Sequence, residues 1–426
     1  MRKKITFIVT RVFWPSNSGR KVVLYNYCKG LYDLHNCEVN LYIFPETNQT
    51  YNETIMTKPY FINKIEFADK VSYFDKITNL FTKTLIKQWP LQCSLYYSKN
   101  NGNKIKKFIQ DTNSEIVFVD MVRLAEYIDY FKEITKTTVI NFDDLLSKRY
   151  KRQIKQLGNK GNIAGVYGKQ LSGFMNSIIN NQFLKKMILS YESRLTEKYE
   201  IEISNQYDFS LFISKIEANE FEKKGTSSKV LSITMGIDER YLKIPLNLEN
   251  RKKNYISYLG NYNYGANQDS IKIICEKIMP LILDKDPNII LKAVGPCPEE
   301  LKDKYSSRNI IFTGEVDDIS AELLETSVFL GYVAYGTGIK TKILEASAMG
   351  LPVVTNSVGA EGIELVHDQE IFISDNFNVM SDYVIKLRND EQLLISVINN
   401  ARKKLELDYK WENILLEFKE IVGGNT

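Results

Sequence analysis

Short apolar runs alternate with longer stretches of helical period along most of the chain. The runs are rich in Val, Ile and Phe, which favour strands. We predict strands at 5–10, 39–44, 116–119, 139–142, 209–214, 255–259, 289–294, 310–312, 328–332 and 351–355. Apolar strands that alternate with helices are typical of parallel sheets covered on both faces. The pattern therefore predicts an α/β protein.

Boundary signals divide this pattern. Ser214, with Glu217 three residues later, forms a capping box and predicts a helix start after the strand at 209–214. Further helices are predicted at 268–283 and at 391–422, the second with a break near residues 408–409. Ile244-Pro245 and the polar run after it predict a linker between two domains, 1–247 and 254–405, followed by a terminal segment at 406–426.

The composition of the chain argues against several classes of function. Of 426 residues, 44% are hydrophobic and 25% are charged, and the net charge of +4 is too small to indicate a nucleic-acid partner. Five cysteines without metal-type spacing predict reduced thiols, and no metal site is visible. No signal peptide opens the sequence, and no apolar run approaches the ~20 residues of a membrane-spanning helix. We expect a cytoplasmic protein.

The densest candidate chemistry lies in the stretch YGTGIKTKILEASAMGLPVVT. Gly336 and Gly338 precede a predicted helix that carries Lys340, Lys342 and Glu345. Glycine lets the backbone approach a ligand, and a helix start offers unpaired N–H groups. Lysines oppose the helix dipole at that end, so they are tolerated there mainly when an anion binds. With a carboxylate placed to accept from a sugar diol, the stretch predicts a nucleotide-diphosphate site.

This stretch resembles the donor-binding segment of the family 4 retaining glycosyltransferases, which have the GT-B fold. The subgroup it resembles has a glycine-rich turn, a basic-x-basic triplet and the sequence LEA, matched by Gly336, Gly338, Lys340, Lys342 and Leu344-Glu345-Ala346. Other matching segments are YLGN at 258–261 with Asn267 and Pro280, IFTG at 311–314 with VDD at 316–318, and YKWENI at 409–414. The resemblance is good from about residue 254 onward and thinner before it.

The resemblance implies two Rossmann-like domains facing each other across a cleft: an acceptor domain at 1–247, a nucleotide-sugar donor domain at 254–405, and a terminal helix that crosses back to the first domain. It implies a retaining, metal-independent hexosyltransferase with a nucleotide-diphosphate sugar as co-substrate and no other cofactor. Lys340 and Lys342 would stabilise the diphosphate, Glu345 would anchor the ribose, and the backbone near Val316 would hold the base. The other donor-binding residues it implies are Gly19, Arg20, Gly260, Asn261, Thr337, Gly338 and Ile339.

The first domain offers two weaker candidates. Gly19 and Arg20 resemble the family's N-terminal glycine loop, and an ordinary strand-to-helix turn is the alternative. Asp143 and Asp144 follow a predicted strand, at the sheet edge where ligands bind in open α/β folds. Asp144 is the candidate for contacting the acceptor hydroxyl or the transferred sugar. The alternative is that the two acids are simply solvated.

The segment 145–191 contains no acid and nine bases: Lys148, Arg149, Lys151, Arg152, Lys155, Lys160, Lys169, Lys185 and Lys186. Two interpretations stay open. A basic amphipathic stretch fits attachment to the anionic inner face of a membrane, where each base contributes about 1 kcal/mol. The other interpretation is a helix packed on the first domain with a solvated basic face.

The function predicted is transfer of a sugar with retention to a glycan or lipid-linked acceptor, as in polysaccharide assembly. Two alternatives remain. A non-catalytic GT-B-like subunit is suggested by Thr337, which stands where many family members have the first of two glutamates. A sugar-nucleotide epimerase would need acids and histidines in the cleft, and the chain has only His35 and His367.

Overall fold

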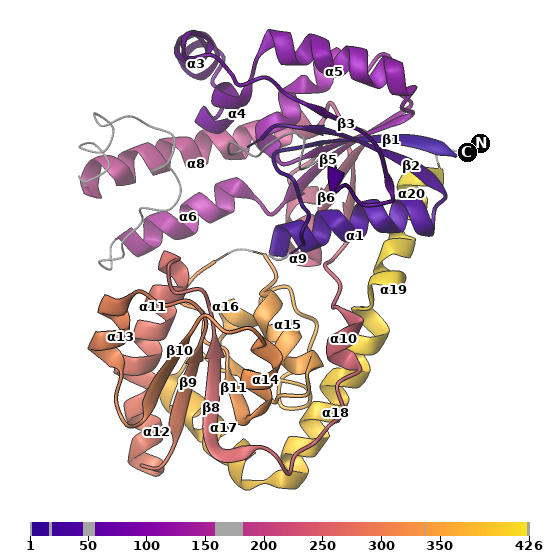
Figure 1. The fold of residues 1–426 in the computed structure, drawn as a ribbon. Helices are drawn as coiled ribbons and strands as arrows, with labels where there is room; N and C mark the ends of the chain where they lie inside the picture. The colour runs from indigo at the N-terminus through magenta and orange to yellow at the C-terminus, as the bar shows by residue number, and fades with distance from the viewer. Residues whose placement is uncertain (1, 17–18, 46–55, 158–181, 337, 424–426) are drawn as a thin grey trace. The chain divides into compact units, whose positions relative to one another are not determined.

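The structure is a computed structural model that describes residues 2–16, 19–45, 56–157, 182–336 and 338–423. The chain divides into two compact units. Unit 1 is formed by Met1–Lys151, Lys186–Gly236 and Trp411–Thr426, and unit 2 by Arg152–Lys185 and Ile237–Lys410. Each unit has its own sheet with helices around it (Figure 1).

Unit 1 contains a seven-stranded parallel sheet in the order β3-β2-β1-β4-β5-β6-β7. The strands are β1 (Lys3–Val9), β2 (Cys37–Ile43), β3 (Ile62–Phe67), β4 (Ile116–Asp120), β5 (Thr137–Asp143), β6 (Phe209–Phe212) and β7 (Lys229–Ser232). The five strands predicted for this half are confirmed. The sequence analysis missed the edge strands β3 and β7, which are largely exposed or only half-buried and so lack a continuous apolar run.

Helices surround this sheet. They are α1 (Gly19–Asp33), α3 (Tyr73–Asn79), α4 (Leu91–Tyr96), α5 (Lys99–Thr112), α6 (Leu146–Leu157), α8 (Gln182–Ser204), α9 (Lys215–Glu222), α19 (Trp411–Leu415) and α20 (Lys419–Gly423), with a π-helix η1 (Leu80–Ile86) and 3₁₀ helices η2 (Val122–Tyr130) and η4 (Leu416–Phe418). The Ser214 hydroxyl accepts from the Glu217 backbone N–H at 3.4 Å, which confirms the predicted cap of α9. The terminal segment packs in unit 1, where Phe418 meets the ring of Tyr27 edge-on at 5.0 Å.

Unit 2 contains a six-stranded parallel sheet in the order β10-β9-β8-β11-β12-β13. The strands are β8 (Lys252–Leu259), β9 (Ile290–Val294), β10 (Ile310–Gly314), β11 (Thr326–Leu330), β12 (Val353–Thr355) and β13 (Phe372–Ile373). The five predicted strands of this half are confirmed, and the short edge strand β13 was not predicted. The two parallel sheets confirm the predicted α/β class.

The helices of unit 2 are α10 (Glu239–Leu242), α11 (Gly265–Ile273), α12 (Met279–Lys285), α13 (Glu299–Tyr305), α14 (Ile319–Leu324), α15 (Thr341–Ala348), α16 (Ser357–Ala360), α17 (Phe377–Asn389) and α18 (Glu391–Asp408). The helix predicted at 268–283 contains a π-helical turn, η3 (Ile274–Ile278), between α11 and α12. Pro280 is the second residue of α12 and has no N–H to donate to the preceding turn, so the α-helical ladder is interrupted there. The predicted break near 408–409 is confirmed, because α18 ends at Asp408.

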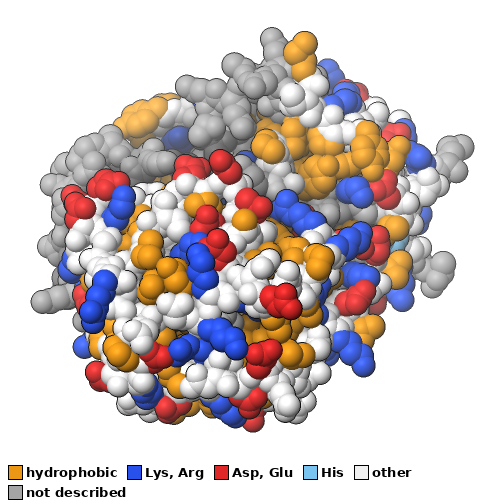
Figure 2. Space-filling model, turned by 60° about the horizontal axis from the view of Figure 1, so that its bottom comes forward, with side chains coloured by type: hydrophobic (Ala, Val, Ile, Leu, Met, Phe, Trp, Pro, Cys, Tyr) orange, Lys and Arg blue, Asp and Glu red, His pale blue; other side chains and the backbone are white. Residues whose placement is uncertain are grey.

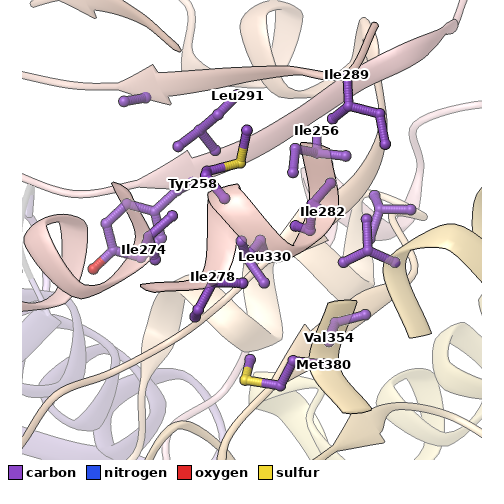
Figure 3. Packing of buried hydrophobic residues seen from close by; sticks show 14 of the residues in the cluster. Ile256, Tyr258, Ile274, Ile278, Ile282, Ile289, Leu291, Leu330, Val354 and Met380 are labelled. Atoms are coloured by element: carbon purple, nitrogen blue, oxygen red, sulfur yellow. The ribbon is translucent and has the colours of Figure 1, made fainter. Parts of the chain in front are cut away.

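The core of unit 2 forms where the helical segment 265–285 covers strands β8 and β9. Figure 3 shows Ile256 and Leu291 from the strands packed against Ile274, Ile278 and Ile282 from the helices. Tyr258 lies at the edge of this cluster in the same view, with its hydroxyl pointing out of the apolar group. Because the Tyr258 ring is fully buried, its hydroxyl group needs a hydrogen-bond partner outside the apolar core.

The surface carries both charge signs. Figure 2 shows a face on which Lys and Arg side chains are interspersed with Asp and Glu, rather than gathered into a field of one sign. This mixture agrees with the small net charge of +4. Within the described ranges, no helix combines the length and the apolar character needed to cross a bilayer.

Candidate functional site

The predicted donor residues of unit 2 gather at one point of its sheet. The strand order reverses between β8 and β11, and in open α/β sheets ligands bind beyond the carboxyl ends of strands at such a switch point. Gly260 and Asn261 directly follow β8, and the loop after β11 leads through Gly338 to the start of α15. The topology therefore brings together two segments that lie about eighty residues apart in the sequence.

Lys342, in the first turn of α15, joins the two segments. Its ammonium donates to the Tyr258 hydroxyl at 2.9 Å, to the Leu259 carbonyl at 3.1 Å and to the Asn267 side-chain oxygen at 3.2 Å. It also lies 4.3 Å from the centroid of the Tyr258 ring. All of these partners are uncharged, and burial lowers the pKa of Lys342 to about 7. A cation held only by neutral groups is a favourable place for an anion.

The floor of this site depends on two glycines. Gly295, after β9, has φ of 121°, and a Cβ there would lie 2.3 Å from the carbonyl oxygen of Gly260. Only glycine permits this approach, which lets the Gly260 N–H bond to the Val294 carbonyl at 3.0 Å. The turn that follows is fixed by Asn267, whose amide donates to the Asn261 carbonyl at 3.0 Å.

Lys340 is the N-cap residue of α15 and is 10% exposed. Its ammonium donates to the Gly338 carbonyl at 2.5 Å and lies 4.0 Å from a carboxylate oxygen of Glu361. Glu361 also pairs with the guanidinium of Arg152, within unit 2. Lys340 thus has an acidic neighbour at the limit of ion-pair distance, whereas in the described part of the chain no carboxylate lies within that distance of the Lys342 ammonium.

Glu345 lies one turn further along α15 and is partly buried. Burial raises the pKa of its carboxyl group, an effect that the positive charge of Arg240 on α10 partly offsets. A carboxylate in this position, beyond the lysines on the same helix, is placed to accept hydrogen bonds from hydroxyl groups.

The other donor residues are less constrained. Gly338 has φ of 68°, a left-handed conformation that favours glycine at the turn before α15. Ile339 follows it and is partly buried. Val316 is also partly buried, in the segment between β10 and α14. Thr337 lies outside the described residues.

A charged cluster occupies the switch point of unit 1, between β1 and β4. The Arg20 guanidinium, at the start of α1, contacts Asp120 at the end of β4 and Asp143 at the end of β5, the latter at 2.7 Å. The Asn141 amide donates to Asp120 at 3.1 Å. Burial raises the pKa of Asp143 to about 6 against the opposing effect of Arg20, and its φ is 67°. Helix α1, which carries Arg20, begins at Gly19.

Asp144 has a different environment. It is buried, and its carboxylate pairs with the Arg149 guanidinium through contacts of 2.5 and 2.7 Å. The alternative that Asp143 and Asp144 are simply solvated is therefore wrong, because each is engaged by an arginine.

The basic helix α6 uses its first four charges internally. Lys148 contacts Glu217 and Glu220, Arg149 contacts Asp144, Lys151 contacts Glu197, and Arg152 contacts Glu361. The contacts of Lys148, Arg149 and Lys151, whose partners all lie in unit 1, favour the packed-helix interpretation for this part of the segment 145–191. The contact of Arg152 is made within unit 2. Residues 158–181 lie outside the described part of the chain.

The sequence analysis missed three site residues. Asp120 directly follows an apolar strand, so the rule that singled out Asp143 and Asp144 applied to it as well. Glu361 lies just beyond α16, and the role of the Tyr258 hydroxyl depends on a contact across the sheet edge. Among the described residues no group of three or more His, Cys, Asp or Glu side chains is arranged to hold a metal.

Known proteins resemble this chain in sequence and in fold. Residues 253–390 match the model of the family described as Glycosyl transferases group 1. One similar structure is Alr3699/HepE of Anabaena in complex with UDP, with a TM-score of 0.64 and 12% identity over 99% of this chain and 100% of that chain. TarM is similar with a TM-score of 0.65 and 12% identity over 99% of each chain. Sucrose-phosphate synthase from Thermosynechococcus elongatus is also similar, with a TM-score of 0.61 and 14% identity over 98% of each chain.

This chain has the GT-B fold. Near-complete coverage of both chains means that the GT-B likeness extends over the whole sequence, including the first half, where the sequence resemblance is thin. A protein of Klebsiella pneumoniae, described as an uncharacterized 44.6 kDa protein in the cps region, is 25% identical over 350 residues, which is 77% of this chain and 84% of that protein.

Proposed function

We propose that this protein is a retaining, metal-independent glycosyltransferase that moves a sugar from a nucleotide-diphosphate donor to an acceptor. The observation that carries the proposal is Lys342: a buried ammonium whose partners are all neutral, at the switch point of the unit 2 sheet and in the first turn of α15. A diphosphate supplies the missing negative charge. The match of residues 253–390 to Glycosyl transferases group 1 supports the same assignment.

The chemistry needs little from protein acids. When the bond between the anomeric carbon and the phosphate oxygen breaks, negative charge grows on the diphosphate. Lys340, Lys342 and the first N–H groups of α15 stabilise that charge electrostatically, which lowers the barrier. The acceptor oxygen bonds to the anomeric carbon on the face that the leaving group vacates, and the departing phosphate oxygen takes the acceptor's proton. No metal enters this scheme.

The remaining donor contacts follow from position. Glu345 accepts from the ribose hydroxyls, and the backbone at Val316 holds the base. Complexes of Alr3699/HepE with UDP and with UDP-glucose make a uridine nucleotide the first donor to test.

The acceptor is proposed to be a glycan or a lipid-linked intermediate of polysaccharide assembly. Two relatives support this class: the Klebsiella pneumoniae protein of the cps region, and a variant of S. aureus TarM solved with fondaparinux, alpha-GlcNAc-glycerol and UDP. Both acids of unit 1 pair with an arginine, but the Asp144 side chain is 6% exposed and the Asp143 side chain is 20% exposed. Asp143 therefore takes the acceptor contact that the sequence assigned to its neighbour.

Turnover decides the proposal. The protein is incubated with a panel of nucleotide sugars, with and without candidate glycan acceptors, and the release of nucleoside diphosphate is measured. Wild type should release it from at least one donor, and Lys342→Met should abolish the release. Nucleotide binding without release across the panel would instead identify a non-catalytic subunit.

A further inference from the structure

A helical segment of unit 1 has its polarity reversed. Helix α3 and the π-helix η1 run consecutively from Tyr73 to Ile86 at the periphery of unit 1 (Figure 1). Six large apolar side chains of this segment are exposed; they are Tyr73, Phe74, Ile77, Phe81, Leu85 and Ile86, called here the outer face. Phe74 and Ile86 are 77% and 76% exposed. Contiguous apolar exposure of this kind marks an interaction surface.

The inner side of the same segment is polar. Its buried residues are Asn79 in α3 and Thr84 in η1. The Asn79 amide donates to the Ser94 carbonyl at 3.0 Å and to the Tyr97 carbonyl at 2.8 Å, and the Thr84 hydroxyl donates to the Ser94 hydroxyl at 2.8 Å. A surface helix of a globular protein normally buries its apolar side. Here hydrogen bonds hold the segment to the protein and leave the apolar side for something else.

The π-helical geometry keeps the outer face continuous. Tyr73, Ile77, Phe81 and Leu85 recur at intervals of four residues. Along an α-helix of 3.6 residues per turn such a series drifts around the axis, whereas a wider i→i+5 turn compensates for the drift. The segment therefore presents one apolar strip along its length.

Charge around the strip identifies its occupant. Between residues 70 and 87 there are four lysines (Lys70, Lys76, Lys83 and Lys87) and one acid (Asp75), a net charge of +3. Among the described residues, neither the Lys76 nor the Lys87 ammonium has a carboxylate within ion-pair distance; Lys87 lies 5.7 Å from the centroid of the Trp89 ring and acts on Glu126 only at longer range. A second copy of this chain would bring like charges together, which opposes self-association. An anionic lipid surface attracts the same lysines and receives the apolar side chains between them.

We propose that α3 and η1 dock unit 1 onto an anionic membrane surface, with the outer face inserted at the boundary between headgroups and acyl chains. The segment is far too short to span a bilayer, so it lies in the plane of the interface. Tyr73, Phe74 and Phe81 supply aromatic rings of the kind enriched at that depth. The docking site is thus this strip rather than the first bases of α6, which are used internally.

Vesicle binding tests the docking proposal without any nucleotide or acceptor. The docking proposal can therefore fail while the transferase assignment stands, and the transferase assignment can fail while the docking proposal stands. Binding is measured by co-sedimentation with vesicles of phosphatidylglycerol and phosphatidylcholine, and with phosphatidylcholine alone. Wild type should prefer the mixed vesicles. Phe74→Ser with Ile86→Ser should weaken that binding at least about tenfold, because two large apolar side chains lose their insertion.

Two further variants complete the test. Ile395→Ser with Leu407→Ser removes exposed apolar side chains from α18 and should leave binding unchanged. Lys76→Gln with Lys87→Gln should weaken it about fivefold per lysine at low salt and less at high salt. All variants should melt like wild type, since the changed residues are exposed or only partly buried. The proposal is overturned if wild type ignores the mixed vesicles, if the outer-face variant binds as well as wild type, or if the outer face instead drives a dimer in sedimentation experiments.

Discussion

The ammonium nitrogen of Lys342 lies 4.3 Å from the ring centroid of Tyr258 and 2.9 Å from the hydroxyl oxygen of the same side chain. The tyrosine is fully buried in the core of unit 2, and the lysine lies in the first turn of the helix that follows the glycine turn. The pair therefore connects the rigid centre of the sheet to the candidate donor site, and it fixes where a positive charge is available.

Lys342 should make donor binding depend on pH. In the free protein burial lowers its pKa to about 7, and a bound diphosphate favours the protonated form. Affinity for a nucleoside diphosphate should be greatest below about pH 7 and fall as the pH rises, by at most about tenfold per pH unit. Isothermal titration calorimetry at pH values below and above 7 measures this affinity. Lys342→Arg, which stays protonated, should lose the dependence, and an unchanged profile in that variant would contradict the assignment.

Lys340 should contribute to the same binding through a charged hydrogen bond. Lys340→Ala should weaken nucleoside diphosphate affinity by about 1.5–3 kcal/mol, or roughly ten- to a hundredfold. Lys302→Ala, on helix α13, removes a more exposed lysine and serves as the matched control. Equal affinities of the two variants would remove Lys340 from the site.

Glu345 should report on the sugar of the nucleotide. If its carboxylate accepts from the ribose, wild type should bind a ribonucleoside diphosphate more tightly than the deoxy analogue that lacks the hydroxyl. Glu345→Ala should bind the two about equally, because the discriminating partner is gone. Retained discrimination in the variant, with an unchanged melting temperature, would place the ribose elsewhere.

Arg20 should be a stability residue as well as a site residue. Arg20→Ala leaves the fully buried Asp120 without its charged partner, so the free energy of unfolding should fall by about 3–5 kcal/mol. Adding Asp120→Asn should recover part of this loss, since the uncompensated charge disappears. Denaturant unfolding measures both, with the exposed Arg194→Ala as a control expected within about 0.5 kcal/mol of wild type.

Gly295 should tolerate no side chain. In Gly295→Ala the new Cβ would lie 2.3 Å from the Gly260 carbonyl oxygen, so strand β8 or β9 must shift. Gly314→Ala is a matched control, because it also has a positive φ but nothing within 4 Å of the added carbon. The control should cost about 1–2 kcal/mol, and Gly295→Ala clearly more, with loss of nucleotide binding. Similar melting temperatures would show that the close approach is dispensable.

The sequence predicted the central strands because they are buried on both faces. β4, apolar up to Asp120, and β11, apolar from Val328 onward, are buried from end to end, and a hydrophobic pattern reveals their apolar residues directly. The edge strands β3, β7 and β13 are short or half-exposed, so their patterns resemble those of loops. What fixes them is pairing with a neighbouring strand, and that information is not local.

The candidate site likewise has a part that the sequence could predict and a part that it could not. The glycine turn and the two lysines were visible because they occupy one short stretch of sequence. The contact between Lys342 and Tyr258 spans 84 residues, and the link between Arg20 and Asp120 spans 100. Such pairs follow from strand order, and no single stretch contains them. The sequence also does not tell which of the two adjacent acids is more deeply buried, and in the structure it is Asp144.

The π-helical turn at Ile274–Ile278 has a consequence for how this protein can vary. An i→i+5 turn holds one more residue than an α-helical turn. The chain therefore holds one more residue here than an α-helical turn would, while the apolar sides of the flanking helices face the sheet. Deletion of a single residue from this turn would return it to ordinary α-helical spacing and keep Asn267 and β9 in place. A length difference of one residue at this point should thus cost little stability, whereas the same change in the tight loop after β8 would displace Gly260 and Asn261 of the candidate donor site.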